Sequence, residues 1–214
     1  MSTLTLHDYW RSTASYRVRI ALNLKGRSYD RRSRDLRCGD HRDAAFKAIA
    51  PQGLVPALEV GEGVLTQSLA ILEWLEETFP EPPLLPKDVA SRAIVRGMAN
   101  LVACDIHPLN NLRVLEVLRG EFQASQAQID RWIAHWVGEG FAAFETLVQR
   151  HGGAYCFGDA PTLADCLLIP QVYSARRFGV ELAPFPRLVA VDERARVLPA
   201  FASAHPDIQP GADP

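Results

Sequence analysis

The sequence predicts an α/β domain followed by an all-helical domain, and three observations indicate this order. Over the first eighty residues, short runs suited to β-strands alternate with segments of helical apolar spacing. The segment 80–86, Pro-Glu-Pro-Pro-Leu-Leu-Pro, cannot continue a helix or a central strand, because proline lacks an N–H donor and fixes its φ angle. From residue 89 onward, nearly all of the chain has helical spacing. We therefore expect a first domain over residues 1–80, a linker over 81–88 and a helical domain over 89–214.

In the first domain the expected order of elements is βαβαββα. The second strand carries several arginines, which suits an edge strand with much of its surface in water. The expected segments are a strand over 4–9, a helix over 15–24 that Gly26 ends, a strand over 29–36, a helix over 43–49, strands over 55–60 and 64–66 joined by the turn Gly61-Glu62-Gly63, and a helix over 68–79.

The second domain is expected to contain helices over 90–118, 126–149, 163–178 and 186–197. Pro108 should kink or interrupt the first of these helices, because it removes a backbone donor. Thr162 and Asp165 have the spacing of a capping box, for which we expect a structural rather than a chemical role. The segment 203–214 is rich in Pro, Gly, Asp and Ala, and we expect it to be mobile.

Composition restricts the class of protein. The formal net charge of −2 over 214 residues excludes a large global attraction to nucleic acid. No apolar run reaches the roughly 18 residues that would span a membrane, and the N-terminus lacks a signal-peptide pattern, so we expect a cytoplasmic protein that binds no membrane. The four cysteines lie far apart and form no Cys-x-x-Cys pair, which favours reduced thiols and no metal site, although Cys104 and His107 are spaced to share a helix face.

A cluster of hydroxyl side chains marks the start of the first helix. Ser12, Thr13 and Ser15 follow the first strand directly and open an amphipathic helix. Such a start directs hydroxyls, free backbone N–H groups and the positive end of the helix dipole toward one point, which suits an anion. The alternative is an N-cap alone, which contributes about 1 kcal/mol to stability.

Several segments of the chain resemble a known family. The phrase Ser-Thr-Ala-Ser-Tyr-Arg-Val-Arg-Ile-Ala-Leu at 12–22, together with the segments 53–58 and 65–75, is similar to the zeta class of the soluble glutathione transferases. The resemblance extends over about residues 4–201 and includes His-Pro-Leu-Asn-Asn at 107–111. It implies the glutathione transferase fold, with a thioredoxin-like first domain and a helical second domain, glutathione as cofactor, and a two-fold homodimer.

The resemblance also implies roles for particular residues. Ser12 would donate a hydrogen bond to the glutathione sulfur and favour the thiolate. The family usually continues Ser-Ser-Cys, whereas this chain has Ser12-Thr13-Ala14, so the accessory role of that cysteine is missing here. Arg11 and Arg177 would bind the carboxylates of an acidic substrate as forked donors, with Arg176 as the alternative if the alignment shifts by one residue.

The remaining implied contacts concern glutathione itself. The bond before Pro56 would be cis, and the backbone of Val55 would pair with the glutathione peptide. Gln67 and Ser68 would hold the γ-glutamyl end, while His41 lies near the glycyl end or is a plain surface residue. The full set assigned to glutathione is Ser12, Thr13, Ala14, Ser15, Tyr16, Arg17, His41, Val55, Gln67, Ser68, His107, Asn111, Leu112 and Arg113, and the set assigned to catalysis is Ser12, Arg11 and Arg177.

The activity that the resemblance implies is the cis–trans isomerisation of maleylacetoacetate, a maleyl keto acid, in tyrosine and phenylalanine catabolism. Isomerisation of maleylpyruvate in gentisate degradation is the nearest alternative, because the two substrates share their reacting group. A general transferase or dehalogenase is a second alternative. A noncatalytic glutathione-binding module is a third, against which the hydroxyl of Ser12 argues.

Overall fold

A computed structural model describes residues 4–61 and 63–213 of the chain. The chain divides into two compact units, Met1–Leu84 with Val197–Pro214, and Leu85–Arg196. The structure thus groups residues 197–214 with the first unit, whereas the sequence analysis placed them in the helical domain. Within the described ranges, no helix combines the length and apolar character that crossing a membrane requires.

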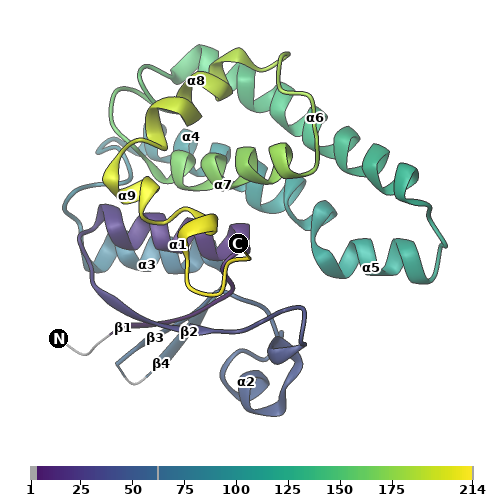
Figure 1. The fold of residues 1–214 in the computed structure, drawn as a ribbon. Coiled ribbons are helices and arrows are strands. Elements are labelled where there is room, and N and C mark those ends of the chain that lie inside the picture. Colours follow the sequence, from purple (N-terminus) through teal and green to yellow (C-terminus); the bar gives the residue numbers. More distant parts are fainter. Residues whose placement is uncertain (1–3, 62, 214) are drawn as a thin grey trace. The chain divides into compact units, whose positions relative to one another are not determined.

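The first unit has the expected element order (Figure 1). Its elements are β1 (Leu4–Asp8), α1 (Thr13–Leu24), β2 (Tyr29–Ser33), α2 (Ala44–Ile49), β3 (Ala57–Val60), β4 (Gly63–Thr66) and α3 (Ser68–Thr78). The strands form one sheet in the order β2-β1-β3-β4, in which β1 pairs with β2 in parallel and with β3 in antiparallel fashion. The βαβαββα prediction is confirmed, except that Glu62 of the predicted turn lies outside the described residues.

The core of the first unit lies between the sheet and the helices α1 and α3. All five residues of β1 are buried, because this strand is central in the sheet. Ile20, Leu58 and Leu72 bring α1, β3 and α3 into that core, each with no exposed surface. The arginine-bearing β2 is an edge strand, as predicted, although it ends at Ser33 rather than at residue 36.

The C-terminal segment 197–213 packs on α1. It contains α9 (Pro199–Ala202) and a 3-10 helix (Pro206–Ile208), and Phe201 is fully buried. The Asn23 side chain donates to the Ala200 carbonyl at 3.0 Å, which ties α9 to α1. Figure 1 shows this segment, in yellow, running beside α1. Within the predicted segment, the Ala204 carbonyl accepts from Arg19 and the Gln209 side chain accepts from Arg31. The structure differs here from the mobility prediction, because composition does not report the hydrogen bonds that a polar segment makes after folding.

The second unit is helical, as predicted. Its helices are α4 (Val89–Asn100), α5 (Leu112–Gly120), α6 (Gln126–His151), α7 (Leu163–Arg177) and α8 (Pro186–Ala195). Between α4 and α5, the chain forms a π-helical segment (Leu101–Ile106) and a 3-10 turn (Pro108–Asn110), so the predicted interruption at Pro108 is present. A Cβ at Gly140 of α6 would lie 2.2 Å from Ile106, so the close approach of these two segments requires glycine.

A buried capping box starts α7. The Asp165 carboxylate accepts hydrogen bonds from the Thr162 N–H at 2.7 Å, from the Thr162 hydroxyl at 2.9 Å and from the Cys156 N–H at 2.9 Å. Burial raises the pKa of Asp165, and these hydrogen bonds oppose the rise. The box satisfies backbone donors inside the core, in agreement with the structural role predicted for it.

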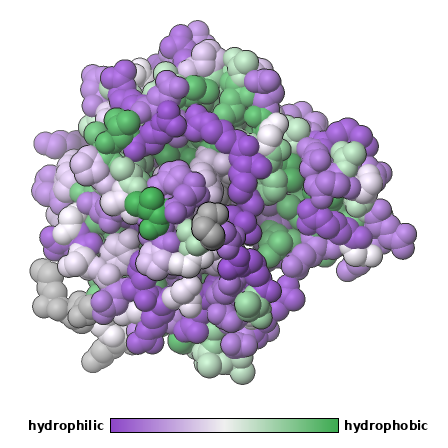
Figure 2. Space-filling model, viewed as in Figure 1, coloured by the Kyte–Doolittle hydropathy of each residue, from purple (hydrophilic) through white to green (hydrophobic). Residues whose placement is uncertain are grey.

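The surface drawn in Figure 2 is largely hydrophilic, with apolar side chains showing in smaller areas. Large apolar side chains that are strongly exposed include Val89, Phe122 and Val197.

We predict that Asp165→Ala lowers the free energy of unfolding by about 3 kcal/mol, because it leaves two buried N–H groups without an acceptor. Ser125→Ala is the matched control: it removes a capping box at the exposed start of α6 and should cost about 1 kcal/mol. Urea denaturation of both variants measures the difference. Equal losses would mean that burial of the α7 box has no energetic consequence.

Candidate functional site

The turn between β1 and α1 presents the Ser12 hydroxyl. The Ser12 N–H donates to the Tyr9 carbonyl at 2.9 Å, which closes the turn. Ser12 is the N-cap of α1, with φ −65° and ψ 118°, and its Oγ accepts the Ser15 N–H at 3.2 Å. The cap uses an oxygen lone pair and leaves the hydroxyl hydrogen available for an external acceptor. The capping role and the predicted sulfur-binding role are therefore compatible.

The other hydroxyls of this cluster face inward. Ser15 has no exposed surface, and its Oγ has no hydrogen-bond partner among the described residues. Thr13 is 7% exposed, and Ser12 is the most accessible of the three. Of the hydroxyls that the sequence left as alternatives, Ser12 is thus best placed to meet a ligand.

The start of α3 forms a second place suited to an anion. Ser68 is the first residue of this 11-residue helix, and its Oγ accepts a hydrogen bond from Arg17 of α1 at 3.2 Å. Arg17 is 2% exposed, so its charge acts through a medium of low dielectric constant. A guanidinium, a hydroxyl and a helix N-terminus meet here, which is an arrangement suited to a carboxylate.

Gln67, directly before α3, has a left-handed backbone with φ 68° and ψ 116°. A residue with a side chain adopts this conformation only at an energetic cost. The Gln67 amide donates to the Gln52 side chain at 2.5 Å, so the loop before β3 and the start of α3 lie next to each other. Strain of this kind is typical of positions that a binding site constrains.

The loop before β3 presents an extended backbone. The bond between Val55 and Pro56 is cis, as predicted. Among the described residues, no backbone group pairs with the N–H or the C=O of Val55, so both groups can pair with a peptide ligand. Gly53 has φ +61°, and a Cβ there would lie 2.7 Å from the His41 carbonyl. This close approach brings the half-buried His41 near the same loop.

Four predicted site residues of the second unit, His107, Asn111, Leu112 and Arg113, lie in one segment. His107 follows the π-helical segment, and its N–H donates to the Val102 carbonyl at 2.9 Å. The Trp132 indole of α6 donates to the Leu109 carbonyl at 2.8 Å and fixes the 3-10 turn. Asn111 is the N-cap of α5 and accepts the Arg113 N–H at 3.2 Å, so its side chain has a structural role here. Leu112 and Arg113 are exposed.

The arginines at the end of α7 have different environments. Arg176 donates to the nearly buried Asp192 at 2.5 Å, and burial raises the pKa of that carboxyl while this hydrogen bond opposes the rise. The exposed Arg177 guanidinium lies 4.2 Å from the centre of the Phe178 ring. Arg11, in the first unit, lies 5.1 Å from the Trp10 ring centre. Arg176 is thus held by α8, and Arg177 is the residue that the resemblance assigns to the substrate.

Sequence reasoning missed the role of Arg19. This residue is fully buried and paired with Asp8 at 2.7 Å. Arg19 lies among apolar residues of a predicted helix, and this position could have indicated its role. A buried charge requires a partner, so a buried arginine predicts an ion pair. Among the described residues, no three His, Cys, Asp or Glu side chains lie close enough to hold a metal ion.

Comparisons with known proteins identify one family. Family models described as "Glutathione S-transferase, N-terminal domain" and "Glutathione S-transferase, C-terminal domain" match residues 11–78 and 126–200. A maleylpyruvate isomerase from a Ralstonia species is 52% identical over 209 residues, which cover 97% of this chain and 99% of the relative. A maleylacetoacetate isomerase from Pseudomonas aeruginosa is 51% identical, covering 97% and 98% of the two chains.

Solved structures agree with these relatives. The holo structure of a maleylpyruvate isomerase, a bacterial zeta-class glutathione S-transferase, matches with a TM-score of 0.96 and 51% identity, covering 98% of this chain and 100% of the other. The maleylacetoacetate isomerase of Anaeromyxobacter dehalogenans with bound glutathione matches with a TM-score of 0.90 and 46% identity, covering 99% and 98%.

We predict that Gln67→Gly is more stable than Gln67→Ala by about 1 kcal/mol, because glycine adopts a positive φ without strain. At an ordinary position alanine would be the more stable of the two. Thermal unfolding of both variants checks the prediction, and Gln52→Ala is the control that removes the same hydrogen bond without changing residue 67. A glycine variant no more stable than the alanine variant would contradict it.

Proposed function

The chain belongs to the glutathione S-transferase family, and from this premise we propose that it catalyses the glutathione-dependent cis–trans isomerisation of maleylacetoacetate to fumarylacetoacetate, in tyrosine and phenylalanine catabolism. The observation that carries this proposal is the accessible Ser12 hydroxyl at the N-terminus of α1. The isomerases named above are about half identical to this chain over nearly its whole length, which supports the same reaction class.

The residues of the first unit fit glutathione. The backbone groups of Val55, which pair with no backbone group of the described residues, match a peptide. The start of α3, where Arg17 donates to Ser68, matches the γ-glutamyl carboxylate. The hydroxyl hydrogen of Ser12 matches a sulfur acceptor. When bound, glutathione supplies a thiolate that adds reversibly to the conjugated cis double bond, so that this bond can rotate.

In this proposal, Ser12 sets the ionisation of the thiol. Its hydroxyl donates to sulfur, and the positive end of the α1 dipole favours a negative charge at the same place. Both effects lower the thiol pKa, as they do for cysteines at helix N-termini. Thr13 and Ser15 are buried at the helix start, and Ala14 between them is half-buried.

Arginines then bind and neutralise the acidic substrate. Arg11 follows Trp10 in the turn that ends at Ser12, and a guanidinium there stabilises the enolate charge that develops during addition. Arg177 binds a substrate carboxylate as a forked donor. The resemblance assigns His107, Asn111, Leu112 and Arg113 to the glutathione site, and we propose that role for them here.

Maleylpyruvate is a second candidate substrate. The Ralstonia maleylpyruvate isomerase is as similar to this chain as the Pseudomonas maleylacetoacetate isomerase is, and the two substrates differ only in the length of the keto-acid tail. A glutathione-dependent absorbance assay with both acids side by side tests the proposal. Turnover of neither acid would refute it, and a higher kcat/KM for maleylpyruvate would select the second candidate.

We also propose that the protein acts as a two-fold homodimer in the cytoplasm. Val117 in α5 and Phe122 just after it are apolar side chains exposed by 40% and 72%, and a second copy would cover exposed side chains of this kind. Light scattering should give twice the 23.7 kDa of the chain. A particle of one chain mass at micromolar concentration would refute the dimer.

We predict that Ser12→Ala lowers kcat about 100-fold or more and changes glutathione affinity little, because this hydroxyl acts on the sulfur while other groups hold the peptide. Ser12→Thr keeps a hydroxyl and should recover part of the rate, which separates the chemical role from the loss of the N-cap. A fully active Ser12→Ala together with an inactive Thr13→Ala would show that Thr13, and not Ser12, acts on the sulfur.

We predict that Arg177→Lys raises KM for the maleyl acid and lowers kcat/KM about tenfold, with glutathione binding intact. Lysine keeps the charge but loses the planar fork, and a charge-assisted hydrogen bond contributes about 1.5 to 3 kcal/mol. Arg176→Lys is the matched control, because Asp192 holds that residue. Steady-state kinetics distinguish the two, and an unchanged KM for Arg177→Lys would remove it from the site.

A further inference from the structure

We propose that Arg19, together with the C-terminal segment 203–209, positions the turn that carries Ser12 and thereby sets the ionisation of bound glutathione. Arg19 acts as a positioning residue, since it binds the turn and not the ligand. The inference rests on the role proposed above for Ser12.

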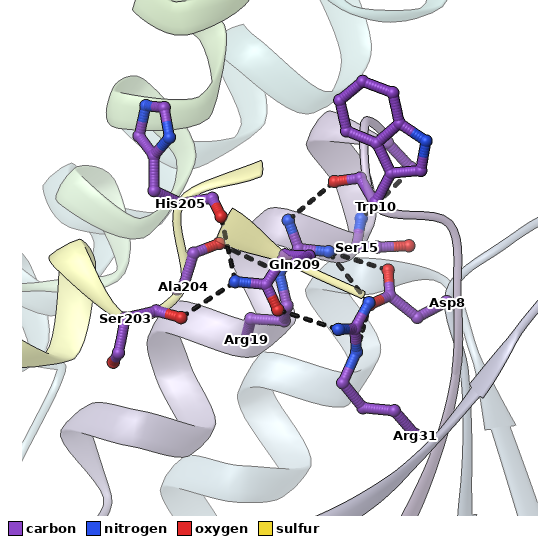
Figure 3. Close-up of polar contacts among 10 residues, drawn as sticks. Asp8, Trp10, Ser15, Arg19, Arg31, Ser203, Ala204, His205 and Gln209 are labelled. Carbon is purple, nitrogen blue, oxygen red and sulfur yellow. Dashed lines mark hydrogen bonds and ion pairs between the residues drawn. The ribbon is translucent and has the colours of Figure 1, made fainter. Parts of the chain in front are cut away.

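The Arg19 guanidinium joins three separate segments (Figure 3). Its Nη1 donates to the two carboxylate oxygens of Asp8 at 2.7 and 3.0 Å, at the end of β1. Its Nη2 donates to the Trp10 carbonyl at 3.0 Å, in the turn before α1, and its Nε donates to the Ala204 carbonyl at 3.0 Å. The planar guanidinium has five donors in a fixed arrangement, so these acceptors are held in a fixed geometry relative to one another.

Gln209 holds the C-terminal side of this arrangement. Its Nε2 donates to the carbonyls of Ser203 and His205 at 2.8 and 2.9 Å, on either side of Ala204. Its Oε1 accepts from Arg31 at 2.9 Å, and Arg31 donates in turn to Asp8 at 2.8 Å. The carboxylate of Asp8 is therefore bound by two arginines, each of which is also bound to the C-terminal segment.

Burial limits how far the residues of this network can move. Asp8 and Arg19 have no exposed surface, and a buried charge without its partner is strongly unfavourable, so the pair has little freedom to separate. The Ser12 N–H is bonded to the Tyr9 carbonyl within the same turn, so a shift of Trp10 moves Ser12 with it. A displacement of about 1 Å at a catalytic group can lower the rate about 100-fold.

A polar side chain elsewhere on α1 supplies a matched control. Asn23 also ties the C-terminal segment to α1, through the Ala200 carbonyl and the Ser203 hydroxyl, both at 3.0 Å. It is bonded to neither Trp10 nor Asp8 in the described structure. Asn23→Ala therefore removes two hydrogen bonds to α1 and leaves the bonds of Arg19 and Gln209 in place.

The experiment measures the thiol pKa of bound glutathione from thiolate absorbance in a pH titration, with glutathione affinity measured by calorimetry and kcat by the isomerase assay. We compare Gln209→Met, which keeps side-chain volume but removes the amide, Arg19→Lys, which keeps the charge but loses the fork, and Asn23→Ala. We expect the first two to raise the thiol pKa by about one unit and to lower kcat about tenfold near neutral pH. Glutathione affinity should change less than about twofold, and Asn23→Ala should resemble the parent protein in thiol pKa and kcat.

A thiol pKa in Gln209→Met equal to that in Asn23→Ala would overturn the inference, and so would equal losses of kcat in these two variants. Gln209→Met decides the case if Arg19→Lys does not fold, because it leaves the Arg19–Asp8 pair intact. The titration needs no isomerase substrate, so a parent protein that ionises glutathione but converts no maleyl acid would refute the proposed function alone. A parent protein that does not lower the thiol pKa would refute both the Ser12 role and this inference.

Discussion

The ion pair between Arg19 and Asp8 is the interaction on which the first unit depends. It joins the end of the central strand β1 to the first helix and has no exposed surface on either side chain. Removing Asp8 would leave Arg19 as a buried, uncompensated charge, which typically costs about 3 to 5 kcal/mol. The proposed sulfur site lies in the turn between these two elements, so its geometry is tied to an interaction that the fold cannot easily lose.

Helix α1 contacts both parts of the proposed glutathione site, because two of its arginines point in different directions. Arg17 and Arg19 are two residues apart, which places them about 200° apart around the helix axis. Arg17 reaches the start of α3, where it donates to Ser68, and Arg19 reaches Asp8 and the turn before α1. The same helix also directs its N-terminus at the place proposed for sulfur. Helix α1 therefore supplies the charge of Arg17 at one end of the proposed glutathione site and the positive end of its dipole at the other.

Much of this architecture was predictable from the sequence. Strand and helix alternation, the proline-rich boundary and the edge position of β2 follow from local patterns, and the cis bond at Pro56 followed from a family resemblance. The C-terminal segment was not predictable, because its order depends on bonds to Arg19, Arg31 and Asn23, which lie more than 170 residues away in the sequence. The choice among Ser12, Thr13 and Ser15 was also open, since it depends on which hydroxyl the folded core covers.

The return of residues 197–214 to the first unit makes that unit discontinuous in sequence, with the helical unit inserted between its two parts. During synthesis, the sheet and α1 leave the ribosome long before the carbonyl that Arg19 requires. Until then the Arg19 guanidinium lacks one of its acceptors. The first unit of the nascent chain is therefore incomplete even if its strands have already paired. This unit is complete only after residues 203–209 have been synthesised, and a chain that stops before them would lack an acceptor that the buried Arg19 uses.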